Sequence, residues 1–418
     1  MPRFFSGNFS SKLEKNRAQT RQGAFDCITW YNSGKLLDER DEDSEMRTRG
    51  PGVLREQNQK KVLSLLRKYR QTSRKDLAKV MGVSKNTISL IVDQYVKDGI
   101  IKEVGVKDLK GAGRPKIVIE LNQNAFKAIG IAVHHNGIKY KVTDFFLNPI
   151  GSGFLEVEGK DKEKVIKLVQ KIVDSLLLEH PEVVGVGIGI PGIVNADEGI
   201  VYHSTNLGWK NFKIYEELKD KIAVPIIVQN NVNMASLCSD GMGDEAGSKS
   251  SFYIRIGDGI GGAFTSEGHI WNGDSWTLGE IGHISVDANG PLCGCGQRGC
   301  LEKLISRKAF QEWMSHMEAT DMSGSVEVKE KQIEAQLKKY GMYLGTSLIS
   351  IIHLLNPGRI IIDSPYNQNE AFQHSLMTYL EKNALKIPFS KTQIHFNEEP
   401  FSQSLGAATA VVLEFERD

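Results

Sequence analysis

The chain has 418 residues, and its 52 Lys and Arg almost balance 51 Asp and Glu, so the formal net charge is +1. This length suits about two or three domains, and the balanced charge excludes a uniformly basic nucleic-acid-binding protein. Any affinity for DNA must therefore come from a local charge excess. Of the five cysteines, Cys27 and Cys238 are isolated, which argues against a secreted disulfide framework and predicts a cytoplasmic protein.

Residues 1–53 mix charged, polar and glycine residues without a sustained hydrophobic period. Such a segment buries too little apolar surface to fold alone, so we expect a disordered arm. Met46 lies just before the first helical pattern and is an alternative start of translation. Met1 is not followed by a signal peptide, and glycines and Pro191 interrupt the longest apolar stretch, so we expect neither a targeting segment nor a membrane span.

Three short helical patterns follow from Leu54. Ser73 and Ser84 are typical N-caps of the second and third helices, and Gly82 lies in the turn between these helices. Two β-rich segments, 100–104 and 116–121, then flank a Gly-containing loop and indicate a wing hairpin. Residues 54–121 are therefore predicted to form a winged helix-turn-helix. The apolar residues expected to face inward are Val62, Leu65, Leu66, Tyr69, Leu77, Val80, Met81, Ile88, Ile91, Val92, Tyr95 and Val96.

Residues 55–116 hold sixteen Lys and Arg against six Asp and Glu, a local excess of ten positive charges. This excess is typical of a protein that binds the phosphate backbone of DNA. Polar side chains at the start of the third helix, opposite its apolar stripe, are placed to meet base edges. They are Lys85, Asn86, Thr87 and Ser89. The alternative is that they form only a solvated polar face.

After residue 121, apolar strands alternate with helices over nearly 300 residues. This alternation predicts an α/β fold with a largely buried sheet. The expected strands are 128–133, 151–157, 183–190, 225–229, 251–256, 261–265 and 359–363, and the expected helices are 162–178 and 335–355.

His283, Cys293, Cys295 and Cys300 lie in one short, glycine-rich region. Thiolates and imidazole are the donors that Zn²⁺ prefers, and four of them leave no open position on the ion. We therefore predict a structural zinc site in segment 283–302. The alternative is a disulfide with a spare thiol, although a bridge between Cys293 and Cys295 would be strained.

Several motifs follow the predicted winged helix in a characteristic order. They are Gly-Ile-Pro191-Gly192, His203-Ser-Thr205, Gln229-Asn-Asn-Val-Asn233, Gly257-Asp-Gly-Ile-Gly-Gly262, Gly279-Glu-Ile-Gly-His283 and Cys293-x-Cys-Gly-x-x-Gly-Cys-x-Glu302. Over residues 54–418 this order resembles the ROK family of repressors and sugar kinases. The resemblance implies that residues 122–418 form an actin-like, ribonuclease-H-like sugar-binding domain of two lobes.

The resemblance also implies a set of sugar contacts, at Gly192, Thr205, Asn230, Asn231, Glu280, His283 and Glu302. Carboxylates and amides suit this role because they form directional hydrogen bonds with adjacent hydroxyls. Zinc on one ring nitrogen of His283 would leave the other to donate to the sugar. The alternatives are solvated carboxylates at Glu280 and Glu302 and turn or capping roles at Thr205 and Asn230.

In the wing, Gly-Arg114-Pro resembles a family element, and Arg114 is expected to enter an A/T-rich minor groove.

Three positions depart from the kinases of the family. Asn231 replaces an aspartate that acts as a general base, and an amide cannot do so. Residues 132–137 read Ala-Val-His-His-Asn-Gly in place of the phosphate motif Asp-x-Gly-Gly-Thr, which removes the close backbone approach to phosphate. Asp258 replaces a small hydroxyl residue and would repel a triphosphate. We therefore expect no catalytic residues and no enzyme activity.

The sequence is thus interpreted as a sugar-responsive repressor of a carbohydrate-utilisation operon. It is expected to bind operator DNA and a sugar inducer as a homodimer or higher oligomer, and to bind no membrane. The resemblance is greatest to xylose repressors, with the N-acetylglucosamine repressor group next, so a xylose-type inducer is expected. Asn231 departs from the acidic residue usual there, which leaves a phosphorylated sugar open. The alternative functions are a regulatory ROK kinase that phosphorylates an aldose with ATP, and, less favoured, a zinc sensor.

Overall fold

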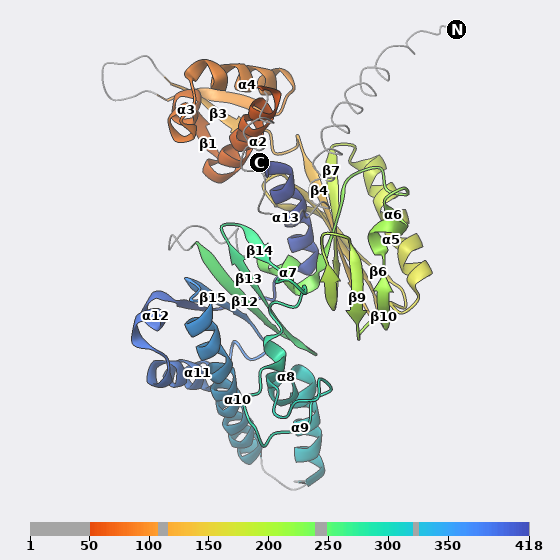
Figure 1. The fold of residues 1–418 in the computed structure, drawn as a ribbon, viewed down its shortest axis with the longest axis vertical. Coiled ribbons are helices and arrows are strands. Elements are labelled where there is room, and N and C mark those ends of the chain that lie inside the picture. The colour runs from red at the N-terminus through yellow and green to blue at the C-terminus, as the bar shows by residue number, and fades with distance from the viewer. Residues whose placement is uncertain (1–50, 108–115, 239–248, 321–325, 418) are drawn as a thin grey trace, which may run out of the picture. The chain divides into compact units, whose positions relative to one another are not determined.

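The computed structural model describes residues 51–107, 116–238, 249–320 and 326–417 (Figure 1). Residues 1–50, including Met46, therefore lie outside the described residues, and the first described helix begins at Pro51. The chain separates into two units. Unit 1 takes the residues up to Gln229 together with the segment from Ala407 onward, and unit 2 is Asn230–Gly406. The winged helix and the first α/β lobe thus share one unit.

Unit 1 opens with the predicted winged helix-turn-helix. The hydroxyl of Ser73 accepts a hydrogen bond from the amide of Asp76, and that of Ser84 accepts one from the amide of Thr87, so both predicted N-caps are confirmed. Gly82 adopts a left-handed φ of 68° in the turn, a conformation that glycine reaches without strain. Three antiparallel strands complete the motif in the order β1-β3-β2. The elements are α2 (Pro51–Tyr69), β1 (Gln71–Ser73), α3 (Arg74–Met81), α4 (Lys85–Lys97), β2 (Ile101–Lys107) and β3 (Lys116–Leu121).

Three of the residues expected to face inward in this motif do not. Tyr69 is 46% exposed, Val80 is 54% exposed and Val96 is 37% exposed. Each lies in the last turn of its helix, where the packing against neighbouring elements ends. The rest of the apolar set is buried or packed against the buried cluster.

The first lobe of unit 1 is a five-stranded mixed sheet in the order β11-β7-β4-β5-β6. β4 pairs in parallel with β7 and antiparallel with β5. Helices α5 and α6 lie on one side of this sheet, and α13 lies on the other (Figure 1). The elements are β4 (Lys127–His134), β5 (Gly137–Asp144), β6 (Pro149–Glu156), α5 (Lys162–Glu179), β7 (Val183–Ile190) and β11 (Ile226–Asn230), with a small sheet of β8 (Ile193–Asn195), β9 (Ile200–Ser204) and β10 (Trp209–Phe212), and helix α6 (Ile214–Leu218).

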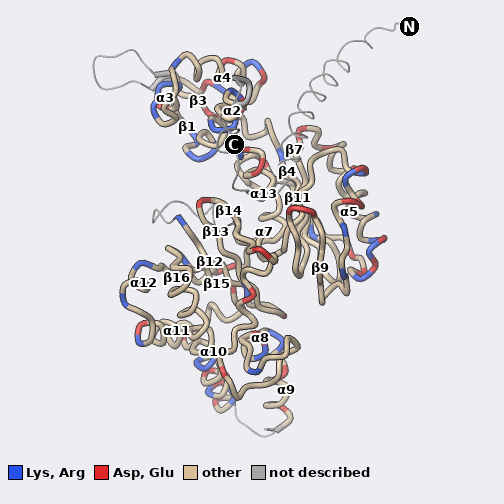
Figure 2. The backbone as a smooth tube through the Cα atoms, in the orientation of Figure 1, with Lys and Arg blue, Asp and Glu red and all other residues tan. Residues whose placement is uncertain are grey.

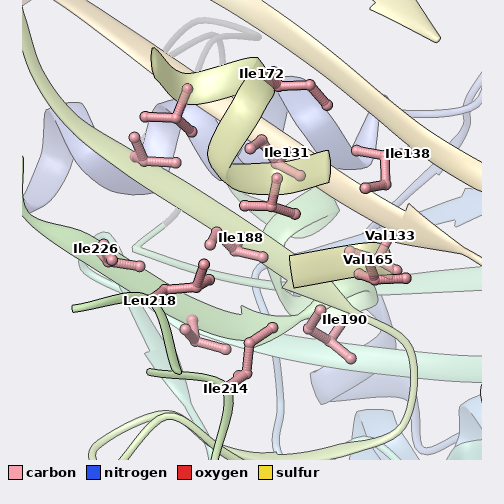
Figure 3. Packing of buried hydrophobic residues seen from close by; sticks show 14 of the residues in the cluster. Ile131, Val133, Ile138, Val165, Ile172, Ile188, Ile190, Ile214, Leu218 and Ile226 are labelled. Carbon is pink, nitrogen blue, oxygen red and sulfur yellow. The ribbon is translucent and has the colours of Figure 1, made fainter. Parts of the chain in front are cut away.

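In this lobe, successive side chains of each strand point to opposite faces of the sheet, so every second residue enters the core. Ile131 and Ile188 point from the sheet toward Val165 and Ile172 of α5 (Figure 3). The opposite face of β7 carries glycines, and a Cβ on Gly187 would lie 2.0 Å from the carbonyl oxygen of Ala407. Helix α13 (Gln403–Glu416) therefore approaches the sheet at backbone distance.

Helix α13 also holds the winged helix against the lobe. Its Ala408, Val411 and Val412 belong to the same buried cluster as the apolar residues of α2, α3 and α4. Arg67 of α2 donates two hydrogen bonds to the carboxylate of Glu416, of 2.7 and 2.8 Å. The Glu416 side chain is 4% exposed. Because residues before Ala407 belong to unit 2, α13 is a helix that the two units share.

Unit 2 is built on a second five-stranded sheet, in the order β14-β13-β12-β15-β16. Glycines in α10 allow close packing with α11, since a Cβ on Gly341 would lie 2.6 Å from the carbonyl oxygen of Phe372. The elements are α7 (Asn231–Ser236), β12 (Ser250–Ile256), β13 (Ile260–Ser266), β14 (His269–Trp271), η3 (Ile281–His283), α8 (Leu301–Ile305), α9 (Arg307–Thr320), α10 (Val326–Leu354), β15 (Arg359–Asp363), α11 (Glu370–Asn383), α12 (Lys386–Lys391) and β16 (Gln393–Phe396).

Within the described residues, no helix combines the length and the apolar character that crossing a bilayer requires.

Candidate DNA-binding, metal and sugar sites

The predicted DNA-contacting residues lie on the first two turns of α4. Lys85 and Asn86 are exposed, whereas Thr87 and Ser89 are half-buried. The hydroxyls of Ser84 and Thr87 are 2.9 Å apart, so the Thr87 hydroxyl takes part in the helix cap. Lysine and arginine recur along α2, α3 and α4 (Figure 2). This surface suits a helix that enters a DNA groove with its N-terminal end. Arg114 lies outside the described residues.

One exposed acid on α4 is neutralised within the motif. Arg74, the first residue of α3, forms ion pairs with Asp93 of α4 and Glu103 of β2, at 2.5 and 2.9 Å. The pairing ties α3, α4 and the wing together. It also reduces the repulsion that Asp93 would exert on a nearby phosphate.

His283, Cys293, Cys295 and Cys300 come together in unit 2, and their ligand atoms all lie within 4.8 Å of one another. The sulfurs of Cys295 and Cys300 are 3.5 Å apart, and the sulfur of Cys293 is 3.6 Å from Nδ1 of His283. Zn–S bonds of about 2.3 Å in a tetrahedron place two sulfurs about 3.8 Å apart. The four donors therefore fit a closed tetrahedral zinc site.

The backbone of segment 283–302 is folded back on itself by short-range bridges. Ser285 pairs with Cys300, and Leu292 pairs with Arg298. Gly299 has a φ of 63°, and a Cβ there would lie 1.7 Å from the carbonyl oxygen of Asp287. Only glycine fits this crossing, so Gly299 lets the chain pass beside Asp287 just before Cys300.

The thiols of the cluster differ in acidity. A hydrogen bond from the backbone amide of Gln297 lowers the pKa of Cys295 to about 7. Burial raises the pKa of Cys300 to about 12. All four cysteines in the described part of the chain are free thiols. A cation would be needed to stabilise several thiolates at such short separations.

The predicted sugar contacts Glu280, His283 and Glu302 lie close together in unit 2. Nε2 of His283, the nitrogen turned away from the thiols, is 3.9 Å from the Glu280 carboxylate. Burial raises the pKa of Glu280, the nearby Glu302 carboxylate raises this pKa further, and His283 partly offsets the rise. Glu302 accepts a hydrogen bond of 3.0 Å from the amide of Ile260. Both carboxylates are thus neighbours of the Cys3His cluster.

Asn230 and Asn231 begin helix α7. The side-chain oxygen of Asn230 accepts hydrogen bonds from the amides of Val232 and Asn233, so it caps the helix. A capping role, the alternative to a sugar contact at Asn230, is therefore confirmed for the side-chain oxygen. Asn231 is 3% exposed. Val232 lies beside Gly261, which places the first turn of α7 next to the Gly-rich loop 257–262.

The remaining two predicted sugar contacts belong to unit 1. Gly192 has a φ of 114°, and a Cβ there would lie 2.2 Å from the carbonyl oxygen of His203. Gly192 therefore packs directly on β9, which ends just before the exposed Thr205. The seven predicted contacts thus divide into two groups, Gly192 and Thr205 in unit 1 and the other five in unit 2.

The Gly-rich loop 257–262 is held by the helices that follow the cluster. Arg307, at the start of α9, donates its backbone amide to the carbonyl oxygen of Gly257 at 2.8 Å. Its guanidinium pairs with Asp258 at 2.7 Å. The charge of Asp258 therefore has a partner within the protein, which weakens the simple repulsion argument made from the sequence.

The segment that replaces the first phosphate motif is a tight hairpin between β4 and β5. The carbonyl oxygen of His135 accepts a hydrogen bond of 2.9 Å from the amide of Gly159. A Cβ on Gly137 would lie 2.5 Å from the Phe154 ring. The carbonyl oxygens of His135 and Asn136 are thus hydrogen-bonded within the protein, although both residues are exposed.

One contact between the winged helix and α13 has no local signal in the sequence. The Arg67–Glu416 pair joins residues 349 positions apart, and neither residue belongs to a motif. A buried glutamate near the end of a helix is visible only after the fold is known.

A winged helix followed by two α/β lobes, the second of which carries a Cys3His cluster, is the architecture of a DNA-binding protein built on a sugar-kinase-like fold. A model described as winged helix-turn-helix DNA-binding matches residues 55–102. The ROK family model matches residues 157–415, more than half of the chain. The chain belongs to the ROK family.

Relatives in this family include repressors and a kinase. The chain is 27% identical over 325 residues to the xylose repressor of Bacillus subtilis, which covers 73% of this chain and 81% of that protein. It is 23% identical over 378 residues to the N-acetylglucosamine repressor of Escherichia coli O157:H7, covering 86% and 93%. It is 31% identical over 201 residues to the glucokinase of Halalkalibacterium halodurans, covering 43% and 61%.

A solved structure shares this fold over most of the chain. A ROK family transcriptional regulator, described as a homologue of the Escherichia coli MLC protein, superposes with a TM-score of 0.74 at 20% identity and covers 87% of this chain and 97% of its own. The fold predicted from the sequence, a winged helix-turn-helix before an actin-like α/β domain, is confirmed.

Proposed function

We propose that the chain is a sugar-responsive transcriptional repressor that binds operator DNA through its winged helix. The observation that carries the proposal is α4, which presents Lys85 and Asn86 to solvent from a capped N-terminal end within a motif of ten excess positive charges. The xylose and N-acetylglucosamine repressors to which the chain is similar support the same function.

The inducer site of this proposal is the group around Glu280, His283 and Glu302. The cluster would hold Zn²⁺ through Nδ1 of His283 and three thiolates, and zinc would supply a fixed ring orientation and no catalysis. Nε2 of His283 then donates to a sugar hydroxyl while the carboxylates accept. The family resemblance adds Gly192, Thr205, Asn230 and Asn231 to the proposed contacts.

Sugar phosphorylation is disfavoured by the chemistry at three positions. Asn231 offers an amide in place of a base. The 135–136 turn has its carbonyls engaged and lacks the glycine pair that approaches phosphate. Asp258 places a carboxylate where the kinases of the family carry a small hydroxyl residue, and Arg307 offsets part of its charge.

A kinase with a regulatory role is the second candidate function, because the chain is similar to a glucokinase and retains the loop 257–262. Incubation with ATP, Mg²⁺ and a panel of aldoses tests it. Sugar-dependent ADP release at more than background rates would establish this function in place of simple repression.

The inducer is proposed to be a xylose-type sugar, since a xylose repressor is among the relatives. A thermal-shift panel of pentoses, hexoses, amino sugars and their 6-phosphates tests this, because a bound ligand stabilises the folded state. The same sugars are then added to the protein bound to operator DNA. An inducer must both raise the melting temperature and release the DNA; if no sugar does either, the sensing half of the proposal is wrong.

The repressor is further proposed to act in the cytoplasm as a homodimer on a palindromic operator, the usual arrangement of helix-turn-helix proteins. Analytical ultracentrifugation with and without operator DNA tests the dimer.

A further inference from the structure

Leu90 is a large apolar residue on the solvent-facing side of α4, and it is 70% exposed. The buried stripe of this helix is Ile88, Ile91, Val92 and Tyr95. At about 100° per residue, Asn86, Leu90 and Asp93 fall within about 60° of one another, directly opposite this stripe. Leu90 therefore occupies the face of the helix that is turned furthest from the core, and it contributes little to packing.

The neighbours of Leu90 limit what can cover it. Asn86 lies one turn before it and can hydrogen-bond a base edge. Asp93 lies one turn after it and pairs with Arg74, so the face carries an ion pair beyond Leu90. Lys85 and Ser89 flank the same two turns. If the start of α4 enters a DNA groove, Leu90 is therefore the last residue of this face that can contact the bases before Asp93.

Leu90 cannot hydrogen-bond, so it can only contact an apolar group of the DNA. In the major groove all four bases present hydrogen-bond donors or acceptors, and thymine alone also presents a 5-methyl group. We propose that Leu90 determines sequence specificity by contacting the 5-methyl group of a thymine in each half of the operator. This inference rests on the proposed function and adds an apolar, base-specific contact to the hydrogen bonds expected from the polar residues of α4.

The test compares thymine with deoxyuridine, which lacks only the 5-methyl group. The operator is first defined by selecting DNA fragments that bind the full chain. Affinity is then measured by fluorescence anisotropy at fixed salt on duplexes in which each thymine is replaced in turn. Burying one methyl contributes about 0.8 kcal/mol. Replacing one particular thymine in a half-site is therefore expected to weaken the binding of the protein to the duplex roughly fourfold.

Leu90→Ala is the matching variant, and it should fold normally because the side chain is mostly exposed. It is expected to bind the unmodified operator several-fold more weakly and to show no further loss on the deoxyuridine duplex. Leu354→Ala is the control, because Leu354 is an 82% exposed leucine at the end of α10. This control should keep both the affinity and the deoxyuridine penalty.

Two negative results have different meanings. If selection enriches no sequence, both the repressor function and this inference are overturned. If an operator is found but every thymine tolerates replacement, or if Leu90→Ala keeps the full deoxyuridine penalty, the inference about Leu90 is wrong while the repressor function stands.

Discussion

Replacing Arg67 with alanine removes one partner of the ion pair that joins α2 to α13. The Glu416 side chain is 4% exposed and that of Arg67 is 22% exposed, and the two bonds between them are 2.7 and 2.8 Å long. Breaking a buried pair of this kind typically costs about 3–5 kcal/mol, because the remaining charge stays buried without its partner. Lys61 contributes a weaker favourable charge, so we expect the lower end, about 3 kcal/mol at neutral pH.

The measurement is hydrogen exchange of peptides from α2 and α13 in the full chain. A loss of about 3 kcal/mol corresponds to roughly a hundredfold loss of protection, since each 1.4 kcal/mol is a factor of ten. Lys331→Ala is the control, because its pair with Glu327 is 73% and 77% exposed and exposed i,i+4 pairs contribute only about 0.3–0.5 kcal/mol. A loss of protection in Arg67→Ala no larger than in this control would refute the reasoning.

The pH dependence of this effect has a defined sign. Burial raises the pKa of Glu416 above its usual value, and Arg67 partly offsets that rise. A carboxyl group with a raised folded-state pKa contributes most stability below its unfolded pKa of 4.5, and this contribution is lost as the pH rises through the folded pKa. Removing Arg67 raises the folded pKa further. The stability difference between wild type and Arg67→Ala should therefore be larger at pH 8 than at pH 5, and an opposite trend would contradict the assignment.

Three further changes have definite expected results. Cys295→Ser should abolish bound zinc, measured by elemental analysis, and the sugar response while leaving operator affinity within about twofold; equal loss of both functions would mean that zinc supports the whole fold. Gly406→Ala should lower the midpoint of urea unfolding by an amount that corresponds to about 1–3 kcal/mol, because the new Cβ would lie 1.8 Å from the carbonyl oxygen of Met234. Gly294→Ala, where no atom lies within 4 Å, is its control and should change the midpoint little. Glu280→Gln should weaken inducer binding about tenfold by isothermal calorimetry with unchanged melting temperature of the free protein; unchanged inducer affinity would remove Glu280 from the site.

Much of the fold could be predicted because its signals are local. Strands β7 and β15 have the predicted bounds, and helix α3 lies between the predicted cap Ser73 and the turn residue Gly82, since apolar periods and N-caps act within a few residues. Strand β1 was not predicted, because its three residues pair with β3 and carry no period of their own. The exposure of Val80 and Val96 was also missed, because helical spacing shows which face is apolar and does not show where a neighbouring element stops covering it.

In the candidate sites, too, the features with a local sequence signal could be predicted and those formed by distant residues could not. The four metal donors occur within eighteen residues of one another in the sequence, and the fold brings all four together. The interpretation of Asp258 was incomplete, because its partner Arg307 is 49 residues away and nothing in the sequence pairs them. The exposure of Leu90 could have been noticed from its position opposite the apolar stripe, yet a leucine in a helix is usually assigned to the core.

Helix α13 also fixes the order in which a newly made chain can finish folding. The 177 residues of unit 2 lie between Gln229 and Ala407, so a ribosome needs roughly ten to thirty-five seconds to make them after the first part of unit 1. During that time the apolar face of the winged helix lacks Ala408, Val411 and Val412, and Arg67 lacks Glu416. The DNA-binding unit, although encoded first, is therefore completed last, and a chain cut short in its final helix presents a winged helix with an uncovered apolar face.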